Sequence, residues 1–189
     1  MTKFKEIYSS SFIDQFGSFA NQFGDLQLLP ATPYIDLERI TKLLGLKINY
    51  EKRDNHFSGN FDEATSTIKV NQNHPETRIR FTIAHEIGHD VLGHHGISFR
   101  SSDLGAYQSV LEKSNEMAAN NFAATLLMPR TLLLNLVKRD INQAGLDDTG
   151  LTPQQVADIT KDIAGELAVS EKSMTYRFQN VRLFVKKND

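Results

Sequence analysis

The pentapeptide His85-Glu86-Ile87-Gly88-His89 combines residue types and a spacing that suit a metal site. It lies in an apolar stretch that predicts a helix, and on a helix two residues four apart have Cβ atoms about 5–6 Å apart. Two imidazoles at that separation can share one Zn²⁺, and the glutamate between them can act as a general base. The alternative interpretation is a helix that carries two solvated histidines. The motif predicts zinc ligands at His85 and His89 and a catalytic Glu86.

A catalytic zinc site takes three protein ligands and leaves one position open for water. The chain has no cysteine, so the third ligand must be a histidine or a carboxylate. Glu116 is the best candidate, because it lies on a second predicted helix whose alanines permit a close approach between helices. Glu112, one turn earlier, is the competitor, and a solvated Glu116 is the alternative. Less favoured candidates lie near or in the loop after the first helix: His94, His95 and Asp103.

Hydrophobic periodicity and capping signals predict the elements that position these residues. The motif helix begins near Pro75 and extends to about Leu92, and the second long helix spans about 109–127. Short strands at 46–50, 57–61 and 67–70 predict a small antiparallel sheet before the motif helix. The remaining helices are predicted at 36–44, 131–137, 153–167 and 171–180. The pattern predicts an α+β fold that is mostly helical.

Phenylalanines in the N-terminal segment follow a helical spacing. Phe12, Phe16, Phe19 and Phe23 fall at i, i+4, i+7 and i+11, which predicts one face of an amphipathic helix. This face either packs on the rest of the chain or forms an arm that docks a partner. We predict a Phe-rich helical arm over residues 1–30, separate from residues 31–189.

Composition limits the class of protein. The formal net charge is −2, from 21 basic and 23 acidic residues, which argues against a global nucleic-acid footprint or a basic membrane face. No apolar run approaches the roughly 18 residues of a transmembrane helix, and the N-terminal segment lacks a continuous signal-peptide core. These features predict a cytoplasmic, soluble protein. They do not predict its oligomeric state.

Two sequence blocks, RFTIAHEIGH at 80–89 and NNFAATLLMP at 120–129, strongly resemble the ImmA/IrrE-type zinc metallopeptidases. The resemblance extends through further segments at 35–46, 68–71 and 169–177, so that it covers most of residues 35–180. It implies a gluzincin-like, zincin-type core over residues 31–189, with the C-terminal helices at 151–181 included. It also implies an endopeptidase of narrow specificity that cleaves a helix-turn-helix repressor of a prophage, mobile element or stress response.

Matched position by position, the resemblance implies that His85 and His89 bind zinc, Glu86 is catalytic and Glu116 is the third ligand. The chain departs from the family pattern at two positions. Ala118 stands where members often carry a second acid, which leaves Glu116 as the clearest choice. Gly93 stands where a histidine is common, so an auxiliary histidine is displaced along the chain, to His94 or His95.

The expected mechanism is hydrolysis of a peptide bond by a water whose pKa zinc lowers to about 7. Glu86 takes the proton of this water and passes it to the leaving amine. Candidates for contact with the transition state or the substrate are His94, His95, Tyr107 and Arg177. Asn120 or a backbone carbonyl is expected to orient the ligands. An extended substrate is expected to add as a strand to the sheet edge at His56–Asn60.

Two other functions compete with this hypothesis. The first is a non-catalytic repressor-binding or toxin–antitoxin component with a structural zinc. Two points argue against it: a structural site needs no general base such as Glu86, and structural zinc sites usually have four protein ligands. The second is a DNA-binding regulator that uses the helix pair 154–167 and 171–180, whose spacing is that of a helix-turn-helix. The acidic residues of that pair oppose its few cations, so we do not expect direct nucleic-acid binding.

Overall fold

The computed structural model describes residues 1–29, 33–94, 100–101, 110–147 and 150–185, and its fold is α+β as predicted. Its sheet comprises β1 (Lys47–Glu51), β2 (Phe57–Asp62), β3 (Thr67–Asn71) and β4 (Arg100–Ser101). The helices of the described residues are α1 (Phe4–Ile7), α2 (Ser10–Ile13), the 3₁₀ helix η1 (Asp14–Phe19), α3 (Ala20–Asp25), α4 (Leu37–Leu44), the 3₁₀ helix η2 (Glu63–Thr65), α5 (Glu76–Val91), α6 (Val110–Leu127), α7 (Arg130–Gln143), α8 (Pro153–Glu166) and α9 (Glu171–Asn180).

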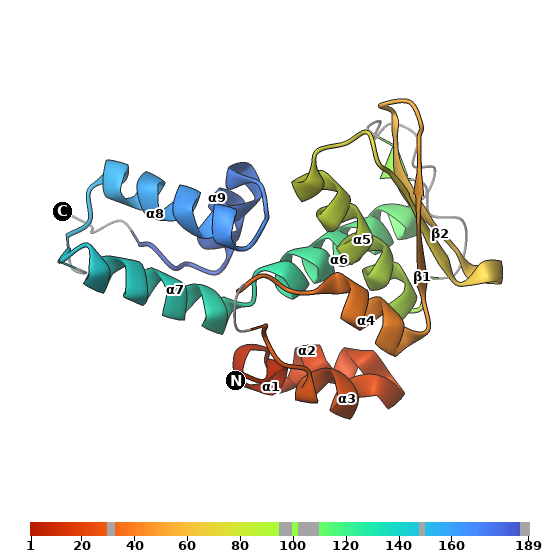
Figure 1. Cartoon of the computed structure of the whole chain (residues 1–189), viewed down its shortest axis with the longest axis horizontal. Coiled ribbons are helices and arrows are strands. Elements are labelled where there is room, and N and C mark those ends of the chain that lie inside the picture. The colour runs from red at the N-terminus through yellow and green to blue at the C-terminus, as the bar shows by residue number, and fades with distance from the viewer. Residues whose placement is uncertain (30–32, 95–99, 102–109, 148–149, 186–189) are drawn as a thin grey trace.

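The elements are arranged around the contacting pair of long helices α5 and α6. Figure 1 shows the sheet beside α5 at one end of the molecule and α7, α8 and α9 at the other, with α1, α2 and α3 beneath α4 and α6. Among the described residues, no helix combines the length and the mean hydropathy of a membrane span. The division of the chain at residue 30 stays a prediction.

Local capping signals correctly predicted several helix ends. Asp36 accepts a hydrogen bond from the Arg39 N–H at the start of α4 (3.2 Å), and Gly45 ends that helix in the left-handed conformation (φ 72°). Thr152 caps α8 with a reciprocal bond from Gln155, and Ser170 caps α9. These side chains satisfy backbone N–H groups that a helix leaves unpaired in its first turn.

The predicted single amphipathic helix in the N-terminal segment is wrong. Gly17 has φ 55° inside η1, so the segment bends and forms α1, α2, η1 and α3 in place of one helix. Three of the four phenylalanines are buried, but Phe19 is 36% exposed. The buried rings contact α6: Phe12 and Phe16 lie 5.0 and 5.7 Å from the Phe122 ring. The segment therefore shares its aromatic core with the helix that carries Glu116.

The sheet is mixed, in the order β1-β3-β2-β4, so the prediction of a fully antiparallel sheet is also wrong. β2 and β3 pair antiparallel, as expected of a hairpin, but β3 inserts between β2 and β1 and pairs parallel with β1. β4 pairs with β2 at Phe57 and Gly59. The predicted substrate edge at His56–Asn60 is thus covered by β4 over these residues, because a strand lies on each side of β2.

Asn71, the last residue of β3, binds the loop that connects β1 to β2. Its side chain is fully buried and its Oδ1 accepts from the N–H groups of Arg53 and Asn73. Its amide nitrogen faces three backbone carbonyls, those of Arg53 (3.2 Å), Asp54 (2.7 Å) and Phe57 (3.0 Å). One side chain therefore satisfies the backbone of a loop that forms no ladder of its own.

We expect Asn71→Ala to lower the free energy of unfolding by about 3 kcal/mol, because it removes at once the hydrogen-bond partner of several backbone groups in the loop. Urea unfolding followed by circular dichroism measures the change. Asn73→Ala is the matched control: Asn73 is exposed and donates a single side-chain bond, to the Arg53 carbonyl. Equal losses in the two variants would contradict the role given to Asn71.

A close crossing brings α5 against α6. A Cβ atom built at Gly88 would lie 3.0–3.2 Å from atoms of Phe122, which is tighter than ordinary van der Waals contact. Glycine at this position permits the approach, and Phe122 in turn packs on Phe12 and Phe16. The separation of the two helices, which sets the geometry of any site between them, is fixed by this contact.

Side chains from both ends of the chain meet the C-terminal end of α6. The Tyr8 hydroxyl donates to the Leu126 carbonyl (2.6 Å), and the Arg177 Nε donates to the Met128 carbonyl (2.9 Å). The last carbonyls of a helix have no partner within it, so these two side chains satisfy groups that would otherwise be stranded in the core. Met174 and Phe178, on either side of Arg177 in α9, are buried.

Candidate metal centre

Three side chains from α5 and α6 converge on one point. His85 and His89 lie one turn apart on α5, and their Nε2 atoms are 3.0 Å apart. Glu116 reaches them from α6, with one carboxylate oxygen 3.2 Å from the His85 Nε2 and the other 3.1 Å from the His89 Nε2. The potential ligand atoms of the three residues all lie within 4.8 Å of one another. The helix spacing and the carboxylate of the neighbouring helix thus produce a compact triangle.

The three side chains are removed from solvent. Their exposed fractions are 0% for His85, 4% for His89 and 9% for Glu116. Burial in a helix pair fixes the rotamers of the group before a metal binds, which lowers the conformational entropy lost on binding.

The donor set fits zinc. With Zn–N and Zn–O bonds of about 2.0–2.2 Å, the ligand atoms of a tetrahedral site lie about 3.3–3.6 Å apart. The observed separations of 3.0–3.2 Å are close to this range. Two imidazoles and one carboxylate are also a donor set typical of catalytic zinc, with a fourth position left for water. The group can hold a divalent metal ion with little rearrangement.

Asn120 sets the tautomer of His85. The Asn120 Oδ1 lies 3.1 Å from the His85 Nδ1, and because an amide oxygen only accepts, the Nδ1 must carry the proton. With the proton held on Nδ1, the Nε2 proton that bonds to Glu116 is the one that a metal would displace, so that the Nε2 lone pair becomes the ligand. Asn120 lies one turn after Glu116 on α6, so one helix supplies both a ligand candidate and the residue that orients another.

We expect Asn120→Ala to weaken zinc affinity by about 10–100-fold, as is typical when the hydrogen-bond partner of a metal-binding histidine is lost. Competition with a chromophoric chelator measures the affinity. Asn121→Ala is the control, because Asn121 is exposed on the next position of the same helix. An unchanged affinity in Asn120→Ala would show that the bond to His85 does not tune the site.

The electrostatics of the group favour an ionised carboxylate. Burial alone raises the pKa of the Glu116 carboxyl, but the hydrogen bonds from His85 and His89 and their charge outweigh it and hold that pKa well below its usual range. Glu116 therefore carries the negative charge that a divalent cation attracts. Glu112, the competing ligand candidate, lies one turn earlier on α6 and is exposed, outside the triangle.

Glu86 lies between the two histidines on α5 and is fully buried. A carboxylate at this position on the helix neighbours the triangle without belonging to it. Its assignment as the general base stays a prediction.

His94 contacts the group from the side of His89. Gly93 ends α5 with φ 66°, the His94 N–H donates to the His89 carbonyl (2.9 Å), and the two Nδ1 atoms lie 3.2 Å apart. Burial, with a contribution from the charge of His89, lowers the pKa of His94 below its ordinary value. The turn at Gly93 thus brings a histidine back beside the triangle.

The other predicted contacts have different outcomes. His95, Tyr107 and Asp103 lie outside the described residues. Arg177 is not brought to the triangle: its guanidinium donates to Met128, at the far end of α6 and roughly 18 Å along the helix axis from Glu116. Its contact with a reacting group is therefore not supported by this geometry. Sequence reasoning missed Phe122, for which Gly88 in the motif was the available signal.

Comparison with known proteins adds a family assignment. The model of the IrrE N-terminal-like domain family, Peptidase_M78, matches residues 41–179. The matched region contains β1 to β3, both long helices and all three members of the triangle. No curated protein matches the chain.

Proposed function

Because the chain belongs to the IrrE N-terminal-like family of peptidases, Peptidase_M78, we propose that it is a zinc-dependent endopeptidase of narrow specificity. The observation that carries this proposal is the convergence of His85, His89 and Glu116 within one buried triangle. The proposal assigns zinc as the metal, these three residues as its ligands and Glu86 as the general base.

The residues of the site divide the chemistry among them. A bound zinc ion would polarise the scissile carbonyl and lower the pKa of a water molecule. Glu86 would accept the proton of the attacking water and deliver it to the leaving amine. Asn120 holds His85 in one tautomer. His94, beside His89, is the described residue best placed to donate a hydrogen bond to the developing oxyanion.

We propose a helix-turn-helix repressor of a prophage, mobile element or stress response as the substrate, cleaved in the cytoplasm. The resemblance of the sequence to the ImmA/IrrE-type enzymes supports this choice. The burial of the three ligand candidates adds a physical reason for narrow specificity, because a peptide bond must enter as an extended, locally unfolded segment. Folded proteins in general do not offer such a segment.

The test is cleavage of the repressor encoded beside the gene by the full chain, first loaded with zinc, then stripped with a chelator and then reloaded. We expect cleavage at one bond, identified by mass spectrometry of the fragments, only in the zinc-loaded samples. A zinc-loaded protein that binds the repressor without cutting it would favour a non-catalytic repressor-binding component. Salt-dependent DNA binding that survives zinc removal would favour a DNA-binding regulator.

A further inference from the structure

The outer edge of β1 has an unusual self-complementary sequence. β1 is the terminal strand of the sheet order β1-β3-β2-β4, and within the described residues it pairs with β3 alone. Its sequence is Lys47-Ile48-Asn49-Tyr50-Glu51, with a cation at one end, an anion at the other and the only amide in the centre. An edge strand presents unpaired backbone N–H and C=O groups, which another extended strand can pair with.

The backbone bonds to the ends of β3 show which groups of β1 face outward. The Lys47 N–H donates to the Ser66 carbonyl, and the Glu51 carbonyl accepts from the Gln72 N–H, both at 2.9 Å. Backbone groups alternate in direction along a strand, so the N–H and C=O groups that point at β3 are those of Lys47, Asn49 and Glu51. The N–H and C=O groups of Ile48 and Tyr50 therefore face the outer edge.

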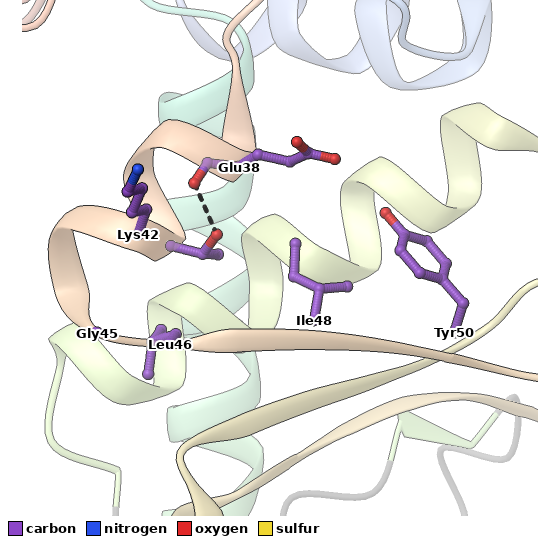
Figure 2. Close-up of a pocket in the computed structure, with 7 residues that line it drawn as sticks. Glu38, Lys42, Gly45, Leu46, Ile48 and Tyr50 are labelled. Carbon is purple, nitrogen blue, oxygen red and sulfur yellow. Dashed lines mark hydrogen bonds between the residues drawn. The ribbon is translucent and has the colours of Figure 1, made fainter.

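The side chains of β1 divide between its two faces. Ile48 and Tyr50 project from the same face, toward α4, as Figure 2 shows. With Glu38, Thr41 and Lys42 of α4 they line a cavity of about 440 Å³, and Tyr50 is 48% exposed beside it. Lys47, Asn49 and Glu51 share the opposite face, on which the Asn49 amide donates to the Glu51 carboxylate (3.1 Å).

We propose that β1 pairs antiparallel with β1 of a second copy of the chain, about a twofold axis through Asn49, to form one continuous sheet. In this register Ile48 lies opposite Tyr50 of the second copy, and the two residues exchange both backbone hydrogen bonds. The Tyr50 ring of the second copy then packs beside Ile48, at the mouth of the cavity between α4 and β1. Cross-strand pairs of an aromatic and a β-branched residue are stabilising.

Charge selects this register and this partner. Lys47 lies opposite Glu51 of the second copy, so the interface contains two symmetric ion pairs on the face away from α4. Glu51 already accepts from Asn49 and Arg53, and a carboxylate has acceptor capacity for a further donor. Shifting the register by two residues places Lys47 opposite Asn49 or opposite Arg53, which loses the ion pairs or opposes two cations. A shift by one residue mismatches the backbone groups.

The first test uses the absence of cysteine from the chain, because any introduced cysteine can form only an intermolecular disulfide. The central Asn49 pair is a non-hydrogen-bonded pair with Cα atoms about 4.5 Å apart, within the range of a disulfide. We expect Asn49→Cys to form a disulfide-linked dimer under mild oxidation. Ala64→Cys, exposed in η2, is the control and should stay monomeric under the same conditions. Equal cross-linking of the two variants would overturn the proposal.

The second test is a charge swap measured by sedimentation velocity over a concentration series of the full chain. Lys47→Glu or Glu51→Lys alone converts both ion pairs into like-charge pairs, and we expect each to weaken dimerisation by about tenfold or more. Mixing the two single variants restores opposite charges at both positions, so the mixture should dimerise as the natural chain does. Misfolding would not be rescued by mixing. A natural chain that stays monomeric throughout, or a dimer that ignores both substitutions, would overturn the proposal.

Discussion

Glu86→Gln is expected to abolish peptide cleavage while the protein keeps its fold and its metal. The substitution preserves the volume of a fully buried side chain and removes its negative charge and its ability to accept and transfer a proton. Loss of a general base lowers the rate by roughly 10³-fold or more when the same residue also protonates the leaving group. The measurement is kcat/KM on the cleaved substrate, with zinc content determined on the same samples.

Glu76→Gln provides the control for this experiment. Glu76 is exposed in the first turn of the same helix, so its substitution should leave the rate unchanged. If Glu86→Gln cut the substrate as fast as the natural chain, Glu86 would not be the base. If zinc were lost as well, the effect on the rate would report on the metal and not on the proton transfer.

Glu116→Gln is expected to weaken zinc binding by at least about 100-fold, because a ligand contributes more than the residues that orient it. The substitution removes the charge that the two imidazoles surround and replaces one carboxylate oxygen with a poor ligand. For the natural chain, free zinc at 100 times its Kd should add about 2.7 kcal/mol of stability. In a chain of this size that is a rise in Tm of roughly 5–10 °C.

Thermal unfolding with and without zinc measures this effect, and each variant is compared with its own metal-free form because the carboxylate also pairs with the histidines. Glu116→Gln should lose the rise in Tm. Glu112→Gln should keep it, since Glu112 is exposed one turn away on the same helix. The reverse outcome would identify Glu112 as the ligand.

The parts of the fold that the sequence predicted are those with local causes. The ends of α4, α8 and α9 follow from Asp36, Thr152 and Ser170, each of which bonds a backbone N–H within three residues of itself. Likewise, two histidines on one helix are placed by helical spacing alone. Such signals act within one turn and do not depend on the rest of the chain.

The parts that were wrong have nonlocal or conformational causes. Periodicity identified the three strands but not their neighbours, because the insertion of β3 is fixed by bonds from Asn71 to a loop well before it in the sequence. The spacing of the N-terminal phenylalanines predicted one continuous helix, because the spacing alone does not reveal that Gly17 adopts a left-handed conformation and bends the segment. The choice between Glu112 and Glu116 depends on how α6 is rotated about its own axis. The sequence does not specify this rotation, because the packing of Phe122 against Gly88 determines it.

The capping of α6 by Tyr8 and Arg177 has a consequence for synthesis of the protein. The last turn of this helix has both of its side-chain partners only when residue 177 has been translated, since one partner lies near the start of the chain and the other far downstream. During translation the C-terminal end of α6 therefore lacks its second side-chain partner until nearly all of the residues up to Arg177 have been added.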